Sequence, residues 1–146
     1  MGSVFYLMRH GTAAAFSPEG DSGRALTEEG SKRFAALVAD LAGELQVRRI
    51  LSSPYARALE TARLLSEAVG VPVEPVQELA SGVSSGGELL ALARASGPGC
   101  ALVGHNPELT DALHLAAREP VRGVPGSVSA FELDQGVTRL LWQREP

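Results

Sequence analysis

Two of the three histidines in this sequence stand in short polar motifs that interrupt apolar segments. His10 lies between Arg9 and Gly11, and His105 precedes an Asn-Pro pair. A neutral imidazole can act as a nucleophile, and nearby arginines favour the neutral form because like charges repel. Arginine also has planar donors that match phosphate oxygens, and Arg57 adds another guanidinium shortly after a Ser-Ser-Pro segment. These residue types predict phosphoryl transfer through a phosphohistidine.

Each motif directly follows a predicted strand. The apolar segment 4–8 ends at Arg9, the segment 100–103 ends just before His105, and a short strand at 49–51 leads to Ser53. Continuous apolar segments of this length are typical of buried parallel strands. In such sheets ligands bind beyond the carboxyl ends of the strands, so the motifs should meet at one edge.

The remaining periodicity predicts helices between these strands and two further strands at the end of the chain. Helices are expected at 28–41, from Ser53-Pro54 to about Val69, at 88–95, and from Asn106-Pro107 to about Arg118. Thr27 and Asn106 are the predicted caps of two of them. A strand at 71–76 should lie near a sheet edge because it contains two prolines. Strands at 127–133 and 137–142 flank a turn at 135–136.

Four alternations of strand and helix predict a three-layer α/β/α sandwich. Its sheet should be mainly parallel, with an antiparallel edge or hairpin near the C-terminus. No linker or repeat divides the 146 residues, so we expect a single domain over 1–146.

Composition excludes several classes of protein. Hydrophobic residues make up 45% and charged residues 21%, which argues against disorder. The net charge of −4 argues against non-specific nucleic-acid binding, and no apolar segment is long enough for a membrane span. One cysteine, Cys100, excludes an internal disulfide, and we expect it to be a small buried hydrophobic residue. Without a visible secretory signal, the predicted compartment is the cytoplasm.

Three ordered motifs closely resemble the histidine phosphatase superfamily, whose members have a phosphoglycerate mutase-like fold. They are the segments 7–11, 52–62 and 103–107. The short chain, the Gly-His-Asn-Pro form of the last motif and the segment 21–30 are similar to the small phosphohistidine phosphatase branch.

The resemblance implies a role for each matching residue. His10 would be the nucleophile that becomes phosphorylated, and Arg9 and Arg57 would bind the phosphate. His105 would complete the pocket and stabilise the transferring group, and the backbone amide of Asn106 would add a phosphate contact. No metal and no cofactor are implied.

Glu78 is the candidate general acid. The segment 77–82 can be aligned with the glutamate and following glycine of longer relatives, although the residues after it lack the aromatic and acidic signature of those proteins. A phosphorylated imidazole needs little help to leave, whereas an alkoxide needs a positioned acid. Weak acid machinery would therefore favour phosphohistidine or phenolic substrates.

The leading hypothesis is a metal-independent phosphatase that removes phosphate from phosphohistidine in proteins. One alternative is a phosphatase of a small phosphorylated metabolite, and another is a non-catalytic phosphate-binding domain of the same fold. The short chain lacks segments that would enclose a metabolite, so it predicts an open, shallow site. The sequence leaves open the roles of Thr12, Asp21 and Arg24, the oligomeric state and the substrate itself.

Overall fold

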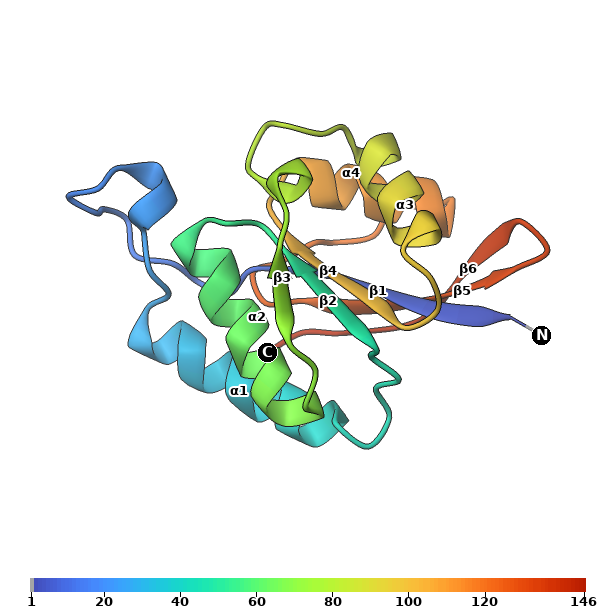
Figure 1. The fold of residues 1–146 in the computed structure, drawn as a ribbon, viewed down its shortest axis with the longest axis horizontal. Helices are drawn as coiled ribbons and strands as arrows, with labels where there is room; N and C mark the ends of the chain where they lie inside the picture. Colours follow the sequence, from blue (N-terminus) through green and yellow to red (C-terminus); the bar gives the residue numbers. More distant parts are fainter. Residues whose placement is uncertain (1) are drawn as a thin grey trace.

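Six strands form one sheet at the centre of the molecule in the computed structural model, which describes residues 2–146 (Figure 1). The strand order is β3-β2-β4-β1-β5-β6. The four parallel strands are β1 (Ser3–Arg9), β2 (Arg49–Ser52), β3 (Val73–Pro75) and β4 (Cys100–Gly104). β5 (Val128–Asp134) runs antiparallel to β1 and forms a hairpin with β6 (Val137–Arg144). The predicted sheet, including its antiparallel C-terminal part, is confirmed.

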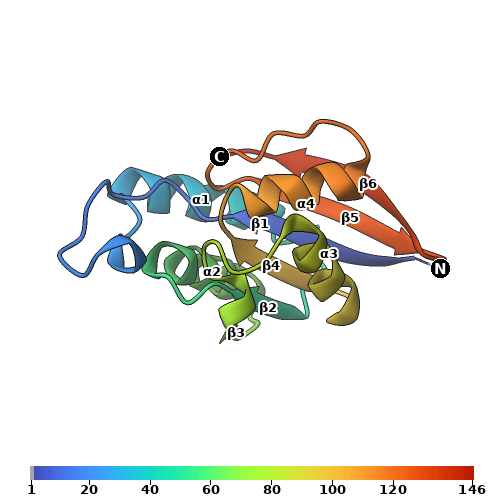
Figure 2. The ribbon, with the colours of Figure 1, turned by 90° about the horizontal axis from the view of Figure 1, so that it is seen from above.

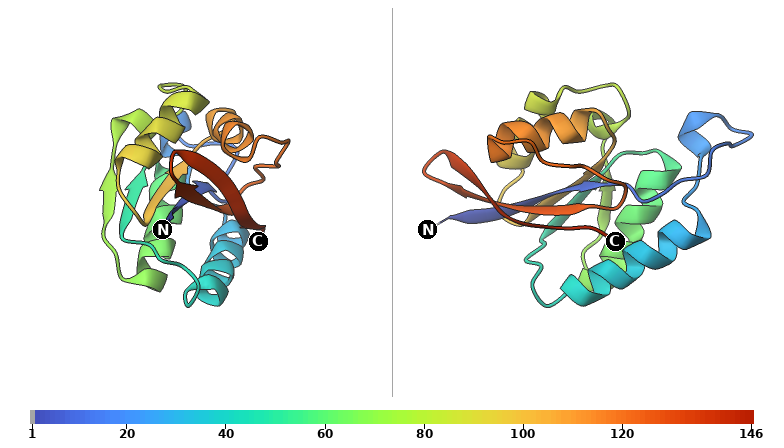
Figure 3. Two further views of the ribbon diagram at one scale, coloured as in Figure 1. Left: turned by 90° about the vertical axis from the view of Figure 1, so that its right-hand side faces the viewer. Right: turned by 180° about the vertical axis from the view of Figure 1, so that it is seen from behind.

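Helices cover both faces of this sheet (Figures 2 and 3). α1 (Glu28–Leu41) and α2 (Ala56–Val69) pack on one face, and α3 (Gly86–Ala95) and α4 (Glu108–Ala117) pack on the other. Alternate residues of β1 supply the two cores: Tyr6 packs toward α1 and α2, whereas Leu7 packs toward α3 and α4. The three-layer prediction is therefore correct.

Strand register brings the two histidine motifs together. Arg9 of β1 pairs with Gly104 of the neighbouring strand β4, so both strands end at the same level. The backbone N–H of His10 donates to the Gly104 carbonyl at 3.1 Å. His10 and His105 consequently leave the sheet side by side.

The start of α2 differs from the prediction. Ser53 and Pro54 precede the helix, which begins at Ala56 with Tyr55 as its N-cap residue. The Tyr55 carbonyl accepts the first helical hydrogen bonds, while the Ser53 hydroxyl accepts from the Tyr55 N–H and contacts His105. The Ser53 side chain therefore contacts the site residue His105 and does not cap α2.

The cap of α4 is also displaced. Pro107 occupies the N-cap position, not Asn106, and α4 begins at Glu108. Asn106 Oδ1 still accepts from the Thr110 N–H at 3.2 Å, so it satisfies one donor of the first turn from outside the cap position.

Other local predictions are confirmed. Thr27 caps α1 by accepting from the Gly30 N–H, and β3 is an edge strand. The turn at Gln135-Gly136 has positive φ at both residues, as a tight hairpin turn requires. Two short 3-10 helices, η1 (Asp21–Gly23) and η2 (Gln77–Leu79), lie in segments for which the sequence predicted no helix.

The segment 12–26 extends beyond the carboxyl end of β1, away from the sheet (Figure 3). Cys100 is fully buried, as a packing role requires. Burial also raises the pKa of its thiol. In the described part of the chain, no helix combines the length and apolar character needed to cross a membrane.

Candidate active site

His10 has a fixed tautomer. Its Nδ1 lies 2.7 Å from the Gly11 carbonyl oxygen, and because a carbonyl can only accept, Nδ1 carries the proton. Nε2 therefore holds the lone pair, and the Arg57 Nε–H donates to it at 3.3 Å. The Gly11 N–H donates to Thr61 Oγ1, which anchors the turn after β1 to α2.

The His10 side chain stays neutral at physiological pH. Burial, opposed by the hydrogen bond to Gly11 and assisted by the charges of Arg57, Arg9 and Arg24, lowers its pKa from 6.5 to about 4. Only 8% of the residue is exposed. The neutral ring with a free Nε2 lone pair is the form that can attack phosphorus.

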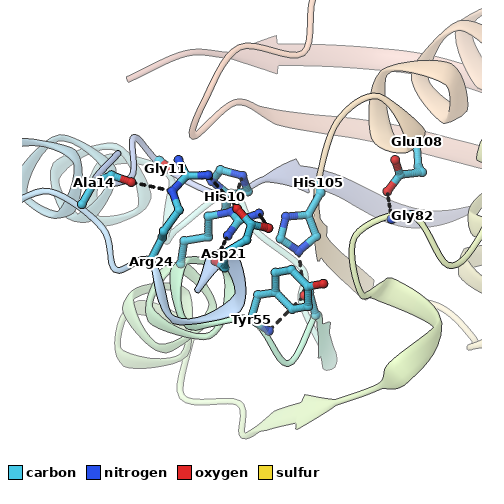
Figure 4. Close-up of polar contacts among 11 residues, drawn as sticks. His10, Gly11, Ala14, Asp21, Arg24, Tyr55, Gly82, His105 and Glu108 are labelled. Atoms are coloured by element: carbon cyan, nitrogen blue, oxygen red, sulfur yellow. Dashed lines mark hydrogen bonds and ion pairs between the residues drawn. The ribbon is translucent and has the colours of Figure 1, made fainter. Parts of the chain in front are cut away.

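Arg57, in the first turn of α2, is held by Asp21. Arg57 NH1 donates to the Asp21 backbone oxygen at 2.7 Å, and NH2 donates to the carboxylate at 3.2 Å. Arg24 NH1 donates to the other carboxylate oxygen at 2.9 Å, and Arg24 Nε donates to the Ala14 carbonyl (Figure 4). Asp21 and Arg24 therefore hold the segment 12–26 against Arg57, a role that the sequence left open.

Arg9 supplies a second guanidinium beside His10. Its NH1 donates to the Gly123 carbonyl at 3.0 Å, and Asn106 Nδ2 donates to the same oxygen. Arg9 Nε is buried and has no protein partner. Burial and the charge of Arg57 lower the pKa of Arg9, so the two cations lie close enough to repel each other. An anion between them would relieve that repulsion.

His105 completes the cluster from the end of β4. Its ring centroid lies 5.1 Å from that of His10 and 4.9 Å from that of Tyr55. Nε2 lies 2.7 Å from Ser53 Oγ, and Nδ1 is buried without a protein partner. Burial lowers the pKa of His105 to about 3, assisted by the positive charge that His10 carries only when it is protonated and by that of Arg57. In the neutral ring one nitrogen carries a proton and the other a lone pair. Nδ1 is therefore either a donor or an acceptor toward a phosphate, depending on the tautomer.

The predicted residues are thus brought together, with the His10 Nε2 lone pair surrounded by hydrogen-bond donors. His10, Arg57 and His105 are in direct or near contact, and Arg9 joins them through the end of β1. Cationic and N–H donors around one lone pair form a site for a tetrahedral oxyanion. Within residues 2–146, no group of three or more His, Cys, Asp or Glu side chains is arranged to hold a metal ion.

Glu78 lies in η2 with its side chain exposed to solvent. Among the described residues its carboxyl makes no hydrogen bond to the site, and its role as a proton donor stays a prediction. The contact of the Asn106 amide with phosphate also stays a prediction. The Thr12 carbonyl accepts from the Thr27 N–H and so joins the ends of the segment 12–26.

The expectation of an open, shallow site stays a prediction. His10 is 8% exposed and Arg57 is 5% exposed, and Asp21 of the segment 12–26 contacts Arg57. Asp21 and Arg24 are more accessible: the Asp21 side chain is 57% exposed and that of Arg24 is 30% exposed.

Sequence reasoning missed the residues that support the site. Ser53 contacts His105, Thr61 holds both Gly11 and the Arg57 carbonyl, and Glu60 accepts from the Leu26 N–H. All three residues lie in the 52–62 motif, which was the sequence signal that could have identified them. Their partners are distant along the chain and could not be read from that motif.

The comparisons with known proteins agree with this geometry. The family described as the histidine phosphatase superfamily (branch 1) matches residues 5–81. A comparison with curated protein sequences found no match.

Solved structures share the whole fold. The protein histidine phosphatase SixA complexed with tungstate is 25% identical, with a TM-score of 0.84 over 98% of this chain and 97% of its own. A phosphohistidine phosphatase SixA described as putative, from Agrobacterium tumefaciens, is 25% identical, with a TM-score of 0.88 over 100% and 99%. A mycobacterial glucosyl-3-phosphoglycerate phosphatase, at 19% identity and a TM-score of 0.68 over 97% and 98%, shares the fold.

Proposed function

This chain belongs to the histidine phosphatase superfamily, and from that premise we propose that it is a metal-independent phosphatase acting through a phosphohistidine on His10. We further propose that its substrate is phosphohistidine in proteins. One observation carries the proposal: His10 Nδ1 donates to the Gly11 carbonyl while Nε2 faces the Arg57 guanidinium. A structural histidine would not need its lone pair directed at a phosphate-binding cation.

The first step would be attack by His10. The Nε2 lone pair forms a bond to phosphorus while the bond from phosphorus to the substrate nitrogen breaks. The released electron pair stays on the substrate imidazole, which takes a proton from solvent. Arg57 Nε, which donates to Nε2 before the reaction, would transfer its hydrogen bond to a phosphoryl oxygen. Arg9 Nε and His105 can supply further donors to the equatorial oxygens.

The second step would be hydrolysis of the phosphoenzyme. Water attacks phosphorus, the bond to Nε2 breaks, and the electron pair returns to His10. The proton of the attacking water passes to the phosphate product or to solvent. The His10 Nδ1–H remains hydrogen bonded to the Gly11 carbonyl in both steps, so His10 returns to its starting tautomer.

The preference for phosphohistidine rests on the leaving group and on the relatives. An imidazole can leave without a strong general acid, whereas an alkoxide cannot. Glu78, the candidate acid, is exposed in η2 and not hydrogen bonded to the cluster. Two structures at 25% identity are described as a protein histidine phosphatase and as a putative phosphohistidine phosphatase, which supports the same substrate class.

The recessed position of His10 favours a second candidate. A side chain that is 8% exposed is reached more easily by a small phosphate ester than by a bulky protein surface. The activity of the protein must therefore be measured with both classes of substrate. A protein substrate would have to project its phosphohistidine past Asp21 and Arg24.

The test is phosphate release without added metal. A phosphohistidine-bearing carrier protein and a set of small phosphate monoesters would be compared, with wild type, His10→Ala and His114→Ala. His114 is an exposed histidine on α4, outside the site, and serves as the matched control. Release from the protein, lost only in His10→Ala, would support the proposal. Preference for a monoester would support the second candidate, and no release from any substrate would leave a binding domain.

A further inference from the structure

Ser53 lies at the centre of the contact that orients His105. It is fully buried in the loop between β2 and α2, and its Oγ lies 2.7 Å from His105 Nε2. The same oxygen accepts the Tyr55 N–H at 3.1 Å. In Figure 4 the His105 ring projects from the end of β4 between His10 and the segment that carries Tyr55.

Two arrangements of protons could satisfy this contact. In one, the Ser53 hydroxyl donates to Nε2, so that His105 carries its proton on Nδ1. In the other, Nε2–H donates to Ser53 Oγ, which would then accept two hydrogen bonds. A serine has one proton and two lone pairs, so both arrangements are chemically allowed.

Burial separates these arrangements. If Nε2–H donated, the Ser53 O–H would have no acceptor among the described residues, although the side chain is fully buried. An unpaired buried hydroxyl costs about 1–3 kcal/mol. If Ser53 donates, its proton and its lone pair are both used, and only His105 Nδ1–H is left without a protein partner.

Charge at the site favours the same arrangement. His105 is 2% exposed, and its Nδ1 is buried in a cluster whose other donors, Arg9 and Arg57, suit an anion. A bare Nδ1 lone pair would repel phosphoryl oxygens, whereas Nδ1–H would donate to one of them. The low pKa of His105 means that the ring cannot escape this choice by becoming doubly protonated at neutral pH.

We propose that Ser53 is a positioning residue that fixes the tautomer of His105, so that Nδ1–H is presented to the transferring phosphoryl group. This inference rests on the proposed function for its catalytic consequence. The tautomer of His105, in contrast, is a property of the protein without substrate. The hydroxyl of Ser53 acts only through His105 and does not touch the substrate.

The first measurement needs no variant. Long-range proton–nitrogen NMR of the histidine-labelled wild-type protein at pH 7 distinguishes protonated from unprotonated ring nitrogens. We expect His105 to show a protonated Nδ1 and an unprotonated Nε2. A protonated Nε2 in the wild type would overturn the proposal. This result does not depend on any substrate, so it stands or falls separately from the phosphatase assignment.

Variants then test the cause. Ser53→Ala should populate the Nε2–H tautomer and lower kcat about 10- to 100-fold with a smaller change in KM. This is less than the roughly 100- to 1000-fold cost of losing one transition-state donor entirely, because part of the population keeps the Nδ1–H tautomer. Ser53→Thr retains the hydroxyl and should restore both the tautomer and kcat to within about threefold. Unchanged kcat and tautomer in Ser53→Ala would refute the role of the serine.

Ser129→Ala is the matched control. Ser129 is equally buried, and its Oγ accepts one hydrogen bond, from Gln143 Nε2 at 2.9 Å on the β5–β6 hairpin. We expect this variant to lose stability without changing the His105 tautomer or kcat. A loss of kcat equal to that of Ser53→Ala would show that any buried serine matters, and would overturn the specific role.

Discussion

Replacing His10 by glutamine should change how the stability of the protein depends on pH. The folded-state pKa of His10 is about 4, against 6.5 for an unperturbed histidine, mainly because the ring is buried. Between these values the unfolded chain binds a proton that the folded protein excludes. Stability contributed by the neutral ring is therefore complete above pH 6.5 and is lost as the pH falls toward 4.

The magnitude follows from the same two values. Each tenfold difference in proton affinity corresponds to about 1.4 kcal/mol, so the full effect is about 3 kcal/mol. Between pH 7 and pH 5 the unfolding free energy of the wild type should fall by about 2 kcal/mol through His10 alone. Glutamine cannot titrate, so His10→Gln should lack this component.

The assay is urea unfolding at pH 7, 6 and 5, followed by circular dichroism. The difference in unfolding free energy between His10→Gln and wild type should shift by about 2 kcal/mol in favour of the variant as the pH falls to 5. His114→Gln, which replaces an exposed histidine on α4 outside the site, serves as the control for the loss of a histidine. Parallel pH profiles for wild type and His10→Gln would refute the conclusion that His10 is buried in its neutral form.

Four further changes test separate parts of the structure. Arg57→Lys should lower kcat/KM about 100- to 1000-fold, because lysine cannot contact His10 and two Asp21 oxygens together, and unchanged steady-state rates would contradict this. Asp21→Asn removes an anion that competes for Arg57, so the inhibition constant of inorganic phosphate should fall about two- to fivefold; an equal or higher constant would count against the competition. Glu78→Gln should slow alkyl phosphate hydrolysis more than phosphohistidine hydrolysis, and equal slowing would remove the acid assignment. Gly30→Ala should destabilise the protein by about 1–3 kcal/mol in urea, because its Cβ would lie 2.5 Å from the Thr12 carbonyl, whereas Gly43→Ala, with nothing within 4 Å, should not.

Much of the architecture could be predicted because it depends on local patterns. The apolar segments around Leu7 and Leu102 are buried strands, and alternation with helices leads to a three-layer sheet. Parallel strands that end together also explain why His10 and His105 could be expected at one edge. These conclusions require only periodicity and chain direction.

Local signals failed where a side chain had two uses. Ser53 before proline is a normal helix-cap pattern, but its hydroxyl contacts His105 and the helix begins at Ala56. Asn106 similarly shares its side chain between Thr110 and the Gly123 carbonyl, and Pro107 takes the cap position. A sequence pattern cannot report which of two competing partners is nearer in space.

The residue types of the site, and the sheet edge at which they meet, follow from the sequence pattern. The protonation state of these residues depends instead on tertiary packing. The pKa of His10 depends on burial, and the tautomer of His10 depends on the Gly11 carbonyl that its Nδ1 faces. The coverage of the site depends on Asp21, which lies 36 residues from Arg57 in the chain but within 3.2 Å of it in space. Burial and long-range hydrogen bonds arise only when distant segments pack, and no local spacing encodes them.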